Sequence, residues 1–89
     1  MHQVIYTEKA NEDLRNIDYS VAKRILKKIL FFANQKDPLT FAKRLTNTDL
    51  GAYRFRIGDY RAIFDTDRQG NIYLLKILRI KHRKDIYNL

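Results

Sequence analysis

The sequence predicts an α+β domain in which one strand and an antiparallel helix hairpin precede a three-strand antiparallel meander. Three observations support this prediction. Residues 4–6 form a short β-prone segment. Apolar residues then recur with the helical period as far as Asp37 and Pro38. After the polar, turn-rich residues 46–51 the period changes to two, which is typical of strands. We therefore expect a curled antiparallel sheet with helices packed on one face.

One domain, residues 1–89, accounts for the whole chain, because 89 residues that are 45% hydrophobic can fill only one core. Cysteine is absent from the sequence, which excludes disulfides and thiolate metal sites. No apolar run approaches the ~20 residues that span a bilayer, and residues 1–6 are too short and polar for a signal peptide. We expect a cytoplasmic protein that does not bind membranes.

The chain is strongly basic, since 18 Lys and Arg against 10 Asp and Glu give a formal net charge of +8. Residues 1–50 have a net charge of +3, and residues 51–89 have +5 in fewer residues. Such a field attracts polyanions and speeds their capture. The charge alone is compatible with nucleic acid, an acidic protein or anionic lipid as the partner.

The first predicted helix is short. Thr7 can cap its start, and Ala10, Leu14 and Ile17 form one buried stripe at the i, i+4, i+7 spacing. Only a few residues separate this helix from the next, so the two are expected to form an antiparallel hairpin.

The second predicted helix has the clearest pattern in the chain. Asp18 or Ser20 can cap its start, and Pro38 ends it because proline disfavours helical geometry in the preceding residue. The predicted buried stripe consists of Ala22, Ile25, Leu26, Ile29, Leu30 and Ala33. The other side carries Lys23, Arg24, Lys27 and Lys28. We interpret these cations as a solvated face, with phosphate or an acidic partner as the alternative. One further helical turn is expected over residues 41–45.

Three strands are predicted in the second half of the chain. In residues 53–57 apolar positions alternate with two arginines, and in residues 60–64 Tyr60, Ala62 and Phe64 alternate with Arg61 and Ile63. Gly58 and Asp59 form the tight turn between these strands. After a second turn over residues 68–71, residues 72–80 are apolar on both sides. This pattern favours a central strand that helices cover on one face and loops partly cover on the other.

Cations gather in the last forty residues. Arg54, Arg56 and Arg61 are expected to project from one face of adjacent strands. A second cluster at the end of the central strand consists of Arg79, Lys81, His82 and Arg83, with Tyr87 shortly after it. These arginines are also compatible with an ordinary solvated face of the sheet. The absence of carboxylates opposite them favours an anion site, because cross-strand pairing would place Asp or Glu there.

The sequence shows no glycine-rich phosphate loop, no paired-histidine motif and no argument for a Ser-His-Asp set. Its two histidines are far apart and its carboxylates are scattered. We therefore expect no metal and no other cofactor.

Two motifs resemble a known family. Residues 51–64, Gly-Ala-Tyr-Arg-Phe-Arg-Ile-Gly-Asp-Tyr-Arg-Ala-Ile-Phe, resemble the central signature of the RelE/ParE superfamily of toxin–antitoxin toxins. Residues 78–87, Leu-Arg-Ile-Lys-His-Arg-Lys-Asp-Ile-Tyr, resemble that family's C-terminal basic motif with His, Arg and Tyr. The length, the first strand and the helix hairpin also match, so the resemblance covers the whole chain.

The resemblance to RelE-like members implies a metal-independent endoribonuclease that cleaves mRNA on the ribosome through the substrate's 2′-hydroxyl and so inhibits translation. It implies a catalytic set of Arg61, Lys81, His82 and Tyr87. It also implies RNA contacts from Arg54, Arg56, Arg79 and Arg83. Some RelE-like toxins carry lysines where this chain has Arg54 and Arg56, and arginine is a poor general base. His82 or Tyr87 is therefore the better candidate for proton transfer.

The resemblance also implies a partner, a cognate acidic antitoxin that covers the arginines in a hetero-complex. The main alternative function is that of a ParE-like toxin, which inhibits DNA gyrase and cleaves nothing. ParE-like proteins generally lack the complete basic, His and Tyr set, which this chain retains, and this favours the nuclease. A simple nucleic-acid-binding module is a third interpretation, and it would not require residues 82–87.

Overall fold

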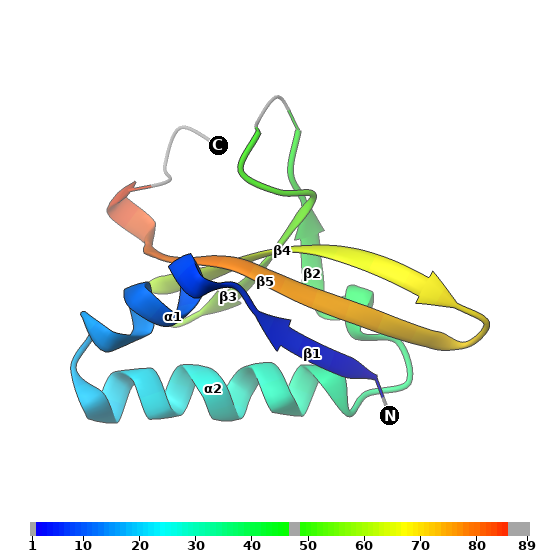
Figure 1. The fold of residues 1–89 in the computed structure, drawn as a ribbon, viewed down its shortest axis with the longest axis horizontal. Helices are drawn as coiled ribbons and strands as arrows, with labels where there is room; N and C mark the ends of the chain where they lie inside the picture. Colours follow the sequence, from blue (N-terminus) through cyan, green and yellow to red (C-terminus); the bar gives the residue numbers. More distant parts are fainter. Residues whose placement is uncertain (1, 47–48, 86–89) are drawn as a thin grey trace.

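The structure, a computed structural model, describes residues 2–46 and 49–85. Five strands form one sheet in the order β1-β5-β4-β3-β2. In chain order the elements are β1 (Gln3–Tyr6), α1 (Glu8–Arg15), α2 (Tyr19–Ala33), the 3₁₀ helix η1 (Pro38–Phe41), β2 (Ala42–Arg44), β3 (Tyr53–Ile57), β4 (Tyr60–Gln69), β5 (Ile72–His82) and the 3₁₀ helix η2 (Arg83–Asp85). Helix α2 runs along one face of the sheet, and α1 lies beside β5 (Figure 1). The predicted α+β fold class is confirmed.

The sheet is mixed, and the expectation of an entirely antiparallel sheet is wrong for β1. Strand β1 pairs in parallel with β5, from Gln3 opposite Leu74 to Tyr6 opposite Ile77. The other neighbouring strands are antiparallel. Direction in a hairpin follows from its short turn, but β1 and β5 are distant in sequence, so only tertiary packing sets their relative direction.

The helical turn predicted over residues 41–45 is also wrong. Ala42–Arg44 forms β2, an edge strand antiparallel to β3. The helical geometry is confined to η1, which ends at Phe41. At the start of η1 the Asp37 carboxylate accepts a hydrogen bond from the backbone N–H of Leu39 at 3.1 Å. A strand of three residues contains too few alternations to produce a period in the sequence.

The caps of the two helices differ. Thr7 Oγ1 accepts a hydrogen bond from the backbone N–H of Ala10 at 3.1 Å, which confirms the predicted cap of α1. Asp18 occupies the N-cap position of α2, but its side chain bonds no helix N–H and instead accepts from the Ser20 hydroxyl at 2.6 Å.

The core lies between α2 and the sheet. Phe32, which is 5% exposed, brings its ring to 4.5 Å from that of Phe55, and Phe55 stacks on Phe64 at 4.3 Å. Leu26 and Leu30 belong to the predicted stripe, but they are 40% and 57% exposed. The predicted stripe spans a wider arc than the single face through which α2 contacts the sheet, so its outer members remain in solvent.

The opposite face of the sheet is partly covered by the segment before β3, as predicted for a central strand. The backbone N–H of Ala52 donates to the Asp65 carboxylate at 2.8 Å. A Cβ atom on Gly51 would lie 2.8 Å from Ile63 and 3.0 Å from Leu78. This close approach buries Ile63 completely on the side away from α2.

No helix within the described residues is both long and apolar enough to cross a membrane.

His2 joins three parts of the chain, although its sequence context does not mark it out. Its side chain is buried, its Nδ1 accepts a hydrogen bond from the backbone N–H of Tyr73 at 2.9 Å, and its Nε2 lies 3.0 Å from the Lys36 carbonyl oxygen. Because Nδ1 accepts, the proton is on Nε2, which donates to that carbonyl. The ring therefore ties the start of β1 to β5 and to the segment after α2.

We expect His2→Ala to lower the free energy of unfolding by about 1–3 kcal/mol, because a backbone donor and a backbone acceptor lose their partner in a part-buried position. Urea denaturation measures this loss. The control is Gln3→Ala, an exposed neighbour that should change stability by less than about 0.5 kcal/mol. Equal midpoints for the two variants would show that the ring does not tie the segments together.

Candidate nucleic-acid interface

Three cations from neighbouring strands form a row across the sheet. Arg56 pairs with Arg61, and Arg61 pairs with Lys81. Side chains of directly paired residues project from the same face of a sheet. Phe55 and Ala62 belong to the core under α2, so alternation places these three cations on the other face. We call Arg56, Arg61 and Lys81 the cation row.

Arg61 is the centre of this row. Its side chain is largely buried, at 9% exposure, and its Nη1 donates to the carbonyl oxygens of Gly58 at 2.9 Å and Tyr60 at 2.8 Å. For Arg61, the interpretation as part of an ordinary solvated face is therefore wrong. The β3–β4 turn bends its carbonyls toward the guanidinium, helped by Gly58 at a φ of 58°, and no pattern in the sequence reveals this.

The surroundings of Arg61 favour a bound anion. Burial lowers the pKa of the Arg61 guanidinium, and the positive charges of Arg54, Arg56 and Arg83 lower it further, while Asp59 opposes them. Like charges held together in a partly buried place repel one another, so an anion that enters among them is stabilised. Phosphate fits this chemistry, since guanidinium groups bind it through paired hydrogen bonds.

Arg83 lies beside the β3–β4 turn. Its backbone N–H donates to the Asp59 carbonyl at 2.7 Å, and its Nε lies 3.5 Å from the Asp59 carboxylate. Both side chains are more than half exposed, so this ion pair is weak and an incoming anion can compete for Arg83.

Arg54 and Arg79 share the second row of the same face, on either side of the buried Ile63. Arg54 is half-buried, and no ion pair involves it among the described residues. Arg79 differs, because its Nε and Nη2 donate to the two Asp13 carboxylate oxygens at 2.8 and 3.0 Å. The resemblance implies an RNA contact from Arg79, and in the structure this side chain forms an ion pair with Asp13 of α1.

Asp13 also binds the backbone of β5. Its Oδ2 accepts from the Ile80 N–H at 2.9 Å. Burial acts to raise the pKa of the carboxyl, but the hydrogen bonds from Arg79 and Ile80 outweigh burial and hold the pKa below its ordinary value. Asp13 and Arg79 are 66 residues apart, so the sequence contains no signal of this pair.

His82 is not brought into the cation row. It pairs with Tyr60 across β4 and β5, and the two rings meet edge to face at 5.2 Å. Since Lys81 projects away from α2, alternation directs His82 to the other face of the sheet. Its Nδ1 accepts from the backbone N–H of Lys84 at 3.2 Å. Tyr87, the remaining predicted catalytic residue, lies outside the described residues.

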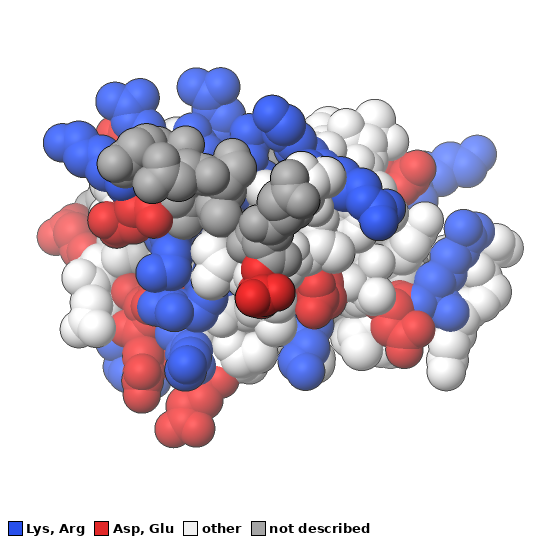
Figure 2. Space-filling model, turned by 90° about the horizontal axis from the view of Figure 1, so that it is seen from above, with Lys and Arg blue, Asp and Glu red and all other residues white. Residues whose placement is uncertain are grey.

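Seen from the side away from α2, Lys and Arg gather along one long edge of the molecule, where few carboxylates are visible (Figure 2). Within the described part of the chain, no three His, Asp or Glu side chains form a group that could hold a metal ion. This face is therefore suited to binding a polyanion through arginine and lysine.

Comparison with known protein families gives one match. A family described as ParE toxin of the type II toxin–antitoxin system parDE matches residues 4–87. No curated protein sequence matches the chain.

Several solved structures share the fold. The chain is similar to a protein of the RelBE2 toxin–antitoxin complex from Mycobacterium tuberculosis, with a TM-score of 0.70, 24% identity, and coverage of 92% of this chain and 98% of that one. A chain of the archaeal RelE–RelB complex from Pyrococcus horikoshii gives a TM-score of 0.65 at 21% identity, covering 92% and 94%. The YoeB/ParE toxin from Agrobacterium tumefaciens gives 0.61 at 15% identity, covering 90% and 97%.

We expect Asp13→Asn to lower the free energy of unfolding by about 1–3 kcal/mol near pH 7, because the pair with Arg79 is only partly exposed. The folded-state pKa of Asp13 is depressed, so its contribution is complete above the unfolded pKa of about 3.9. It disappears as the pH falls through the lower folded-state value. The melting temperatures of the wild-type chain and Asp13→Asn, measured between about pH 7 and about pH 2, should therefore converge as the pH falls. Glu12→Gln, an exposed neighbour on α1, is the control, and a gap that stays constant with pH would contradict this account.

We expect Arg61→Ala to cost about 1–3 kcal/mol of stability, because the variant loses two hydrogen bonds and a buried stem. Arg56→Ala, which removes an exposed member of the same row, should cost less than about 0.5 kcal/mol. It should still weaken salt-dependent binding of single-stranded RNA and reduce the salt slope by about one unit or less. If both variants melt together, the turn carbonyls do not hold Arg61.

Proposed function

The chain belongs to the ParE toxin family of type II toxin–antitoxin systems, and from this premise we propose that it inhibits translation by cleaving mRNA without a metal. The observation that carries the proposal is the cation row around the buried Arg61. There, cations from neighbouring elements converge, and among the described residues the exposed Asp59 is the carboxylate that opposes their effect on Arg61. RNA presents a phosphate to such a surface at every nucleotide.

The proposed reaction uses the RNA's own nucleophile. The 2′-hydroxyl oxygen attacks the adjacent phosphorus, a base removes its proton, and the bond from phosphorus to the 5′-oxygen breaks. The leaving 5′-oxygen takes up a proton, so the products are a 2′,3′-cyclic phosphate and a 5′-hydroxyl. Negative charge accumulates on the phosphorane oxygens between these events, and fixed cations that face them lower the barrier.

The cations of the row differ in how firmly their side chains are held. Arg61 is held by two turn carbonyls, so its guanidinium needs little reorganisation when charge develops, and we assign it to the phosphorane. Arg54, Arg56 and Arg83 are assigned to flanking phosphates. Arg79 is already paired with Asp13, so we assign it to holding β5 rather than to RNA.

Proton transfer requires a group other than arginine, which keeps its proton at all ordinary pH values. Lys81 is the member of the row with an amine that can exchange a proton, and it lies in register with Arg61. We therefore propose Lys81 for proton transfer at the phosphate. Tyr87, beyond the end of β5 in the sequence, is proposed as the second group. His82 faces the other side of the sheet, so we do not assign it to the phosphate that the cation row holds.

A second function has an observation in its favour. The matching family is described as ParE rather than RelE, and His82 projects from the face opposite the cation row. A chain that inhibits DNA gyrase without cleaving RNA would need the basic face for binding but no proton-transfer groups.

We also propose an acidic antitoxin as the partner of this chain. Solved relatives of similar fold are toxin–antitoxin complexes, and a net charge of +8 favours an acidic segment over a neutral one.

The proposal is tested by adding the purified chain to translating ribosomes and mapping mRNA ends by primer extension. We expect defined cleavage with 2′,3′-cyclic phosphate ends, and no cleavage where the target nucleotide is replaced by its 2′-deoxy form. Treating the chain with EDTA and removing the chelator before the assay should leave the rate unchanged. Lys81→Ala should slow single-turnover cleavage by roughly 100-fold or more.

Lys76→Ala is the matched control, because Lys76 is an exposed lysine on the same strand away from the row. A supercoiling assay with DNA gyrase is run beside it. Inhibited gyrase together with intact mRNA would replace the nuclease with the gyrase inhibitor.

A further inference from the structure

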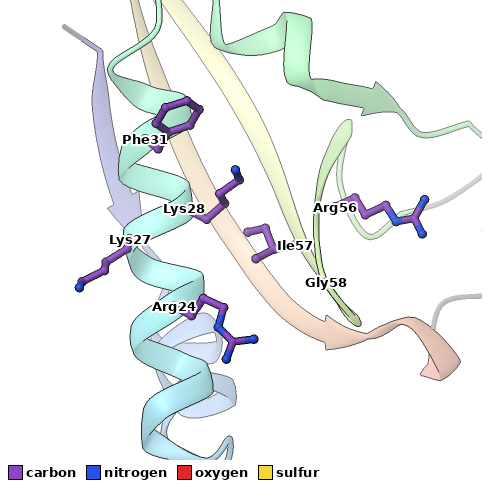
Figure 3. Close-up of a pocket in the computed structure, with 7 residues that line it drawn as sticks. All are labelled: Arg24, Lys27, Lys28, Phe31, Arg56, Ile57 and Gly58. Carbon is purple, nitrogen blue, oxygen red and sulfur yellow. The ribbon is translucent and has the colours of Figure 1, made fainter.

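The α2 side of the sheet has two hollows that differ in their chemistry. One is a groove of about 440 Å³ between α2 and the end of β3 (Figure 3). Cations surround its apolar floor, and the residues concerned are Arg24, Lys27, Lys28 and Arg56 around Phe31 and Ile57. The other hollow is a wider cavity of about 820 Å³ beyond the C-terminal end of α2, where amides and aromatic rings accompany the cations. We call this cavity the distal pocket, and its lining includes Asn34, Lys36, Phe41, Arg68, Asn71 and Tyr73.

The distal pocket exists because the β4–β5 hairpin is longer than the helix that covers it. Beyond the last turn of α2 the hairpin continues to its turn at Gly70 and Asn71, and no helix covers it there (Figure 1). The start of β1, the segment after α2 and η1 supply the other walls. A concave site of this volume is in the range that small-molecule ligands occupy.

A stack of aromatic and guanidinium groups forms one wall of the pocket. The Tyr73 ring lies 5.3 Å from the His2 ring between centroids, and the Arg68 guanidinium carbon lies 5.2 Å from the Tyr73 centroid. The Arg68 Nε donates to the Gly70 carbonyl at 2.8 Å, so the hairpin turn holds this guanidinium in place. Its two Nη groups make no hydrogen bond to the described residues. They are therefore available to a phosphate, which guanidinium groups bind through paired hydrogen bonds.

A second aromatic surface faces the same pocket. Phe41 is 43% exposed, and its ring stacks on that of the buried Phe32 at 5.2 Å between centroids. The stack holds the Phe41 ring in place while part of it remains in solvent. Nucleobases stack on aromatic side chains presented in this way.

Side-chain amides add hydrogen-bonding groups of both kinds. Asn34, the C-cap of α2, and Asn71, in the hairpin turn, line the pocket, and their side chains make no hydrogen bond within the described part of the chain. Gln35 donates its Nε2 to the Phe31 carbonyl at 2.9 Å and keeps its Oε1 for another partner. An amide offers a donor and an acceptor together, which is the combination that the edge of a nucleobase presents.

The charge of the pocket favours an anionic ligand. Lys36 and Arg68 line it, and neither forms an ion pair with the described residues. Asp37 is the one carboxylate among the lining residues, and it already accepts from the Leu39 N–H. The last carbonyls of α2 are not free to attract a cation, because N–H groups of the two residues after the helix and of His2 bond to them.

From these observations we infer that the distal pocket binds a nucleotide unit. The base lies against the Phe41 ring, where the side-chain amides of Asn34 and Asn71 bond to its edge, and Arg68 holds the phosphate. A free nucleoside monophosphate and one nucleotide of a single strand present this same chemistry.

The distal pocket is separate from the cation row, so this inference does not rest on the proposed cleavage. Tyr73 and Lys81 are roughly 26 Å apart along β5 at the usual rise of a strand. Tyr73 packs against the core under α2, whereas Lys81 belongs to the row on the other face. One nucleotide cannot reach both sites.

The test measures binding of adenosine 5′-monophosphate and of a fluorescein-labelled single-stranded RNA to the ¹⁵N-labelled full-length chain. The backbone amide signals of Asn71 and Tyr73 should shift on saturation. Arg68→Ala should raise the Kd about tenfold or more, because the phosphate loses charge-assisted hydrogen bonds. Phe41→Leu should raise it about fivefold or more, because the base loses its stacking surface while an apolar side chain still covers Phe32.

Two matched controls should leave both Kd values within about twofold. Arg44→Ala removes an exposed arginine whose guanidinium also lies over a tyrosine ring, that of Tyr53, at 6.0 Å. Tyr19→Leu removes an aromatic side chain that is 79% exposed at the start of α2. Melting curves confirm that all four variants fold.

The two probes distinguish the source of the nucleotide. Saturation by the monophosphate, weakened in the two pocket variants, identifies a site for free nucleotides. RNA binding that those variants weaken, without saturation by the monophosphate, identifies a site for one nucleotide of a strand.

Three outcomes overturn the inference: neither probe shifts the pocket signals, the pocket variants bind both probes as the controls do, or ribose 5-phosphate binds as tightly as the monophosphate. The last outcome would show an anion site that takes no base. Cleavage of mRNA by the wild-type chain is measured in parallel. A chain that cleaves no mRNA but binds either probe in this pocket retains the inference and loses only the nuclease proposal.

Discussion

The carboxylate of Asp13 joins the two halves of the fold. Strand β1 covers the outer edge of β5 only as far as Ile77, and beyond that point α1 takes over. The Thr7 hydroxyl donates to the Leu78 carbonyl, and Asp13 accepts from Ile80 N–H while holding Arg79. Without these bonds the outer edge of β5 beyond Ile77 would be open, and buried backbone groups there would lack hydrogen-bond partners. Lys81 directly follows Arg79 and Ile80, so the bonds that Asp13 makes to those two residues also fix the backbone beside Lys81.

The proposed active site is made of backbone geometry as much as of charge. Arg61 is useful because the β3–β4 turn holds it, and its two carbonyl acceptors belong to the same hairpin that sets the pairing of Arg56 with Arg61. Repulsion among the surrounding arginines is a cost to the folded chain that a bound phosphate removes. Stability and anion binding are thus in opposition at this site, while Asp13 and Arg79 lie just outside it as a neutral pair.

The two faces of the sheet differ in their surface chemistry. The face away from α2 presents the cation row, and the α2 side presents a groove that is basic at its rim and apolar at its floor. Arg56 belongs to both, since it stands at the open edge of β3.

Local patterns in the sequence were sufficient to predict the two helices, the Thr7 cap, the long strands and the alternation that places Arg54, Arg56 and Arg61 on one face, because each depends on neighbours a few residues away. Tertiary structure alone decided the direction of β1, the exposure of Leu26 and Leu30, the burial of Arg61, the pairing of Arg79 with Asp13 and the role of His2. Each of these depends on a contact between distant segments or on the shape of a turn. A residue's type specifies which bonds it can form, but packing selects its partner.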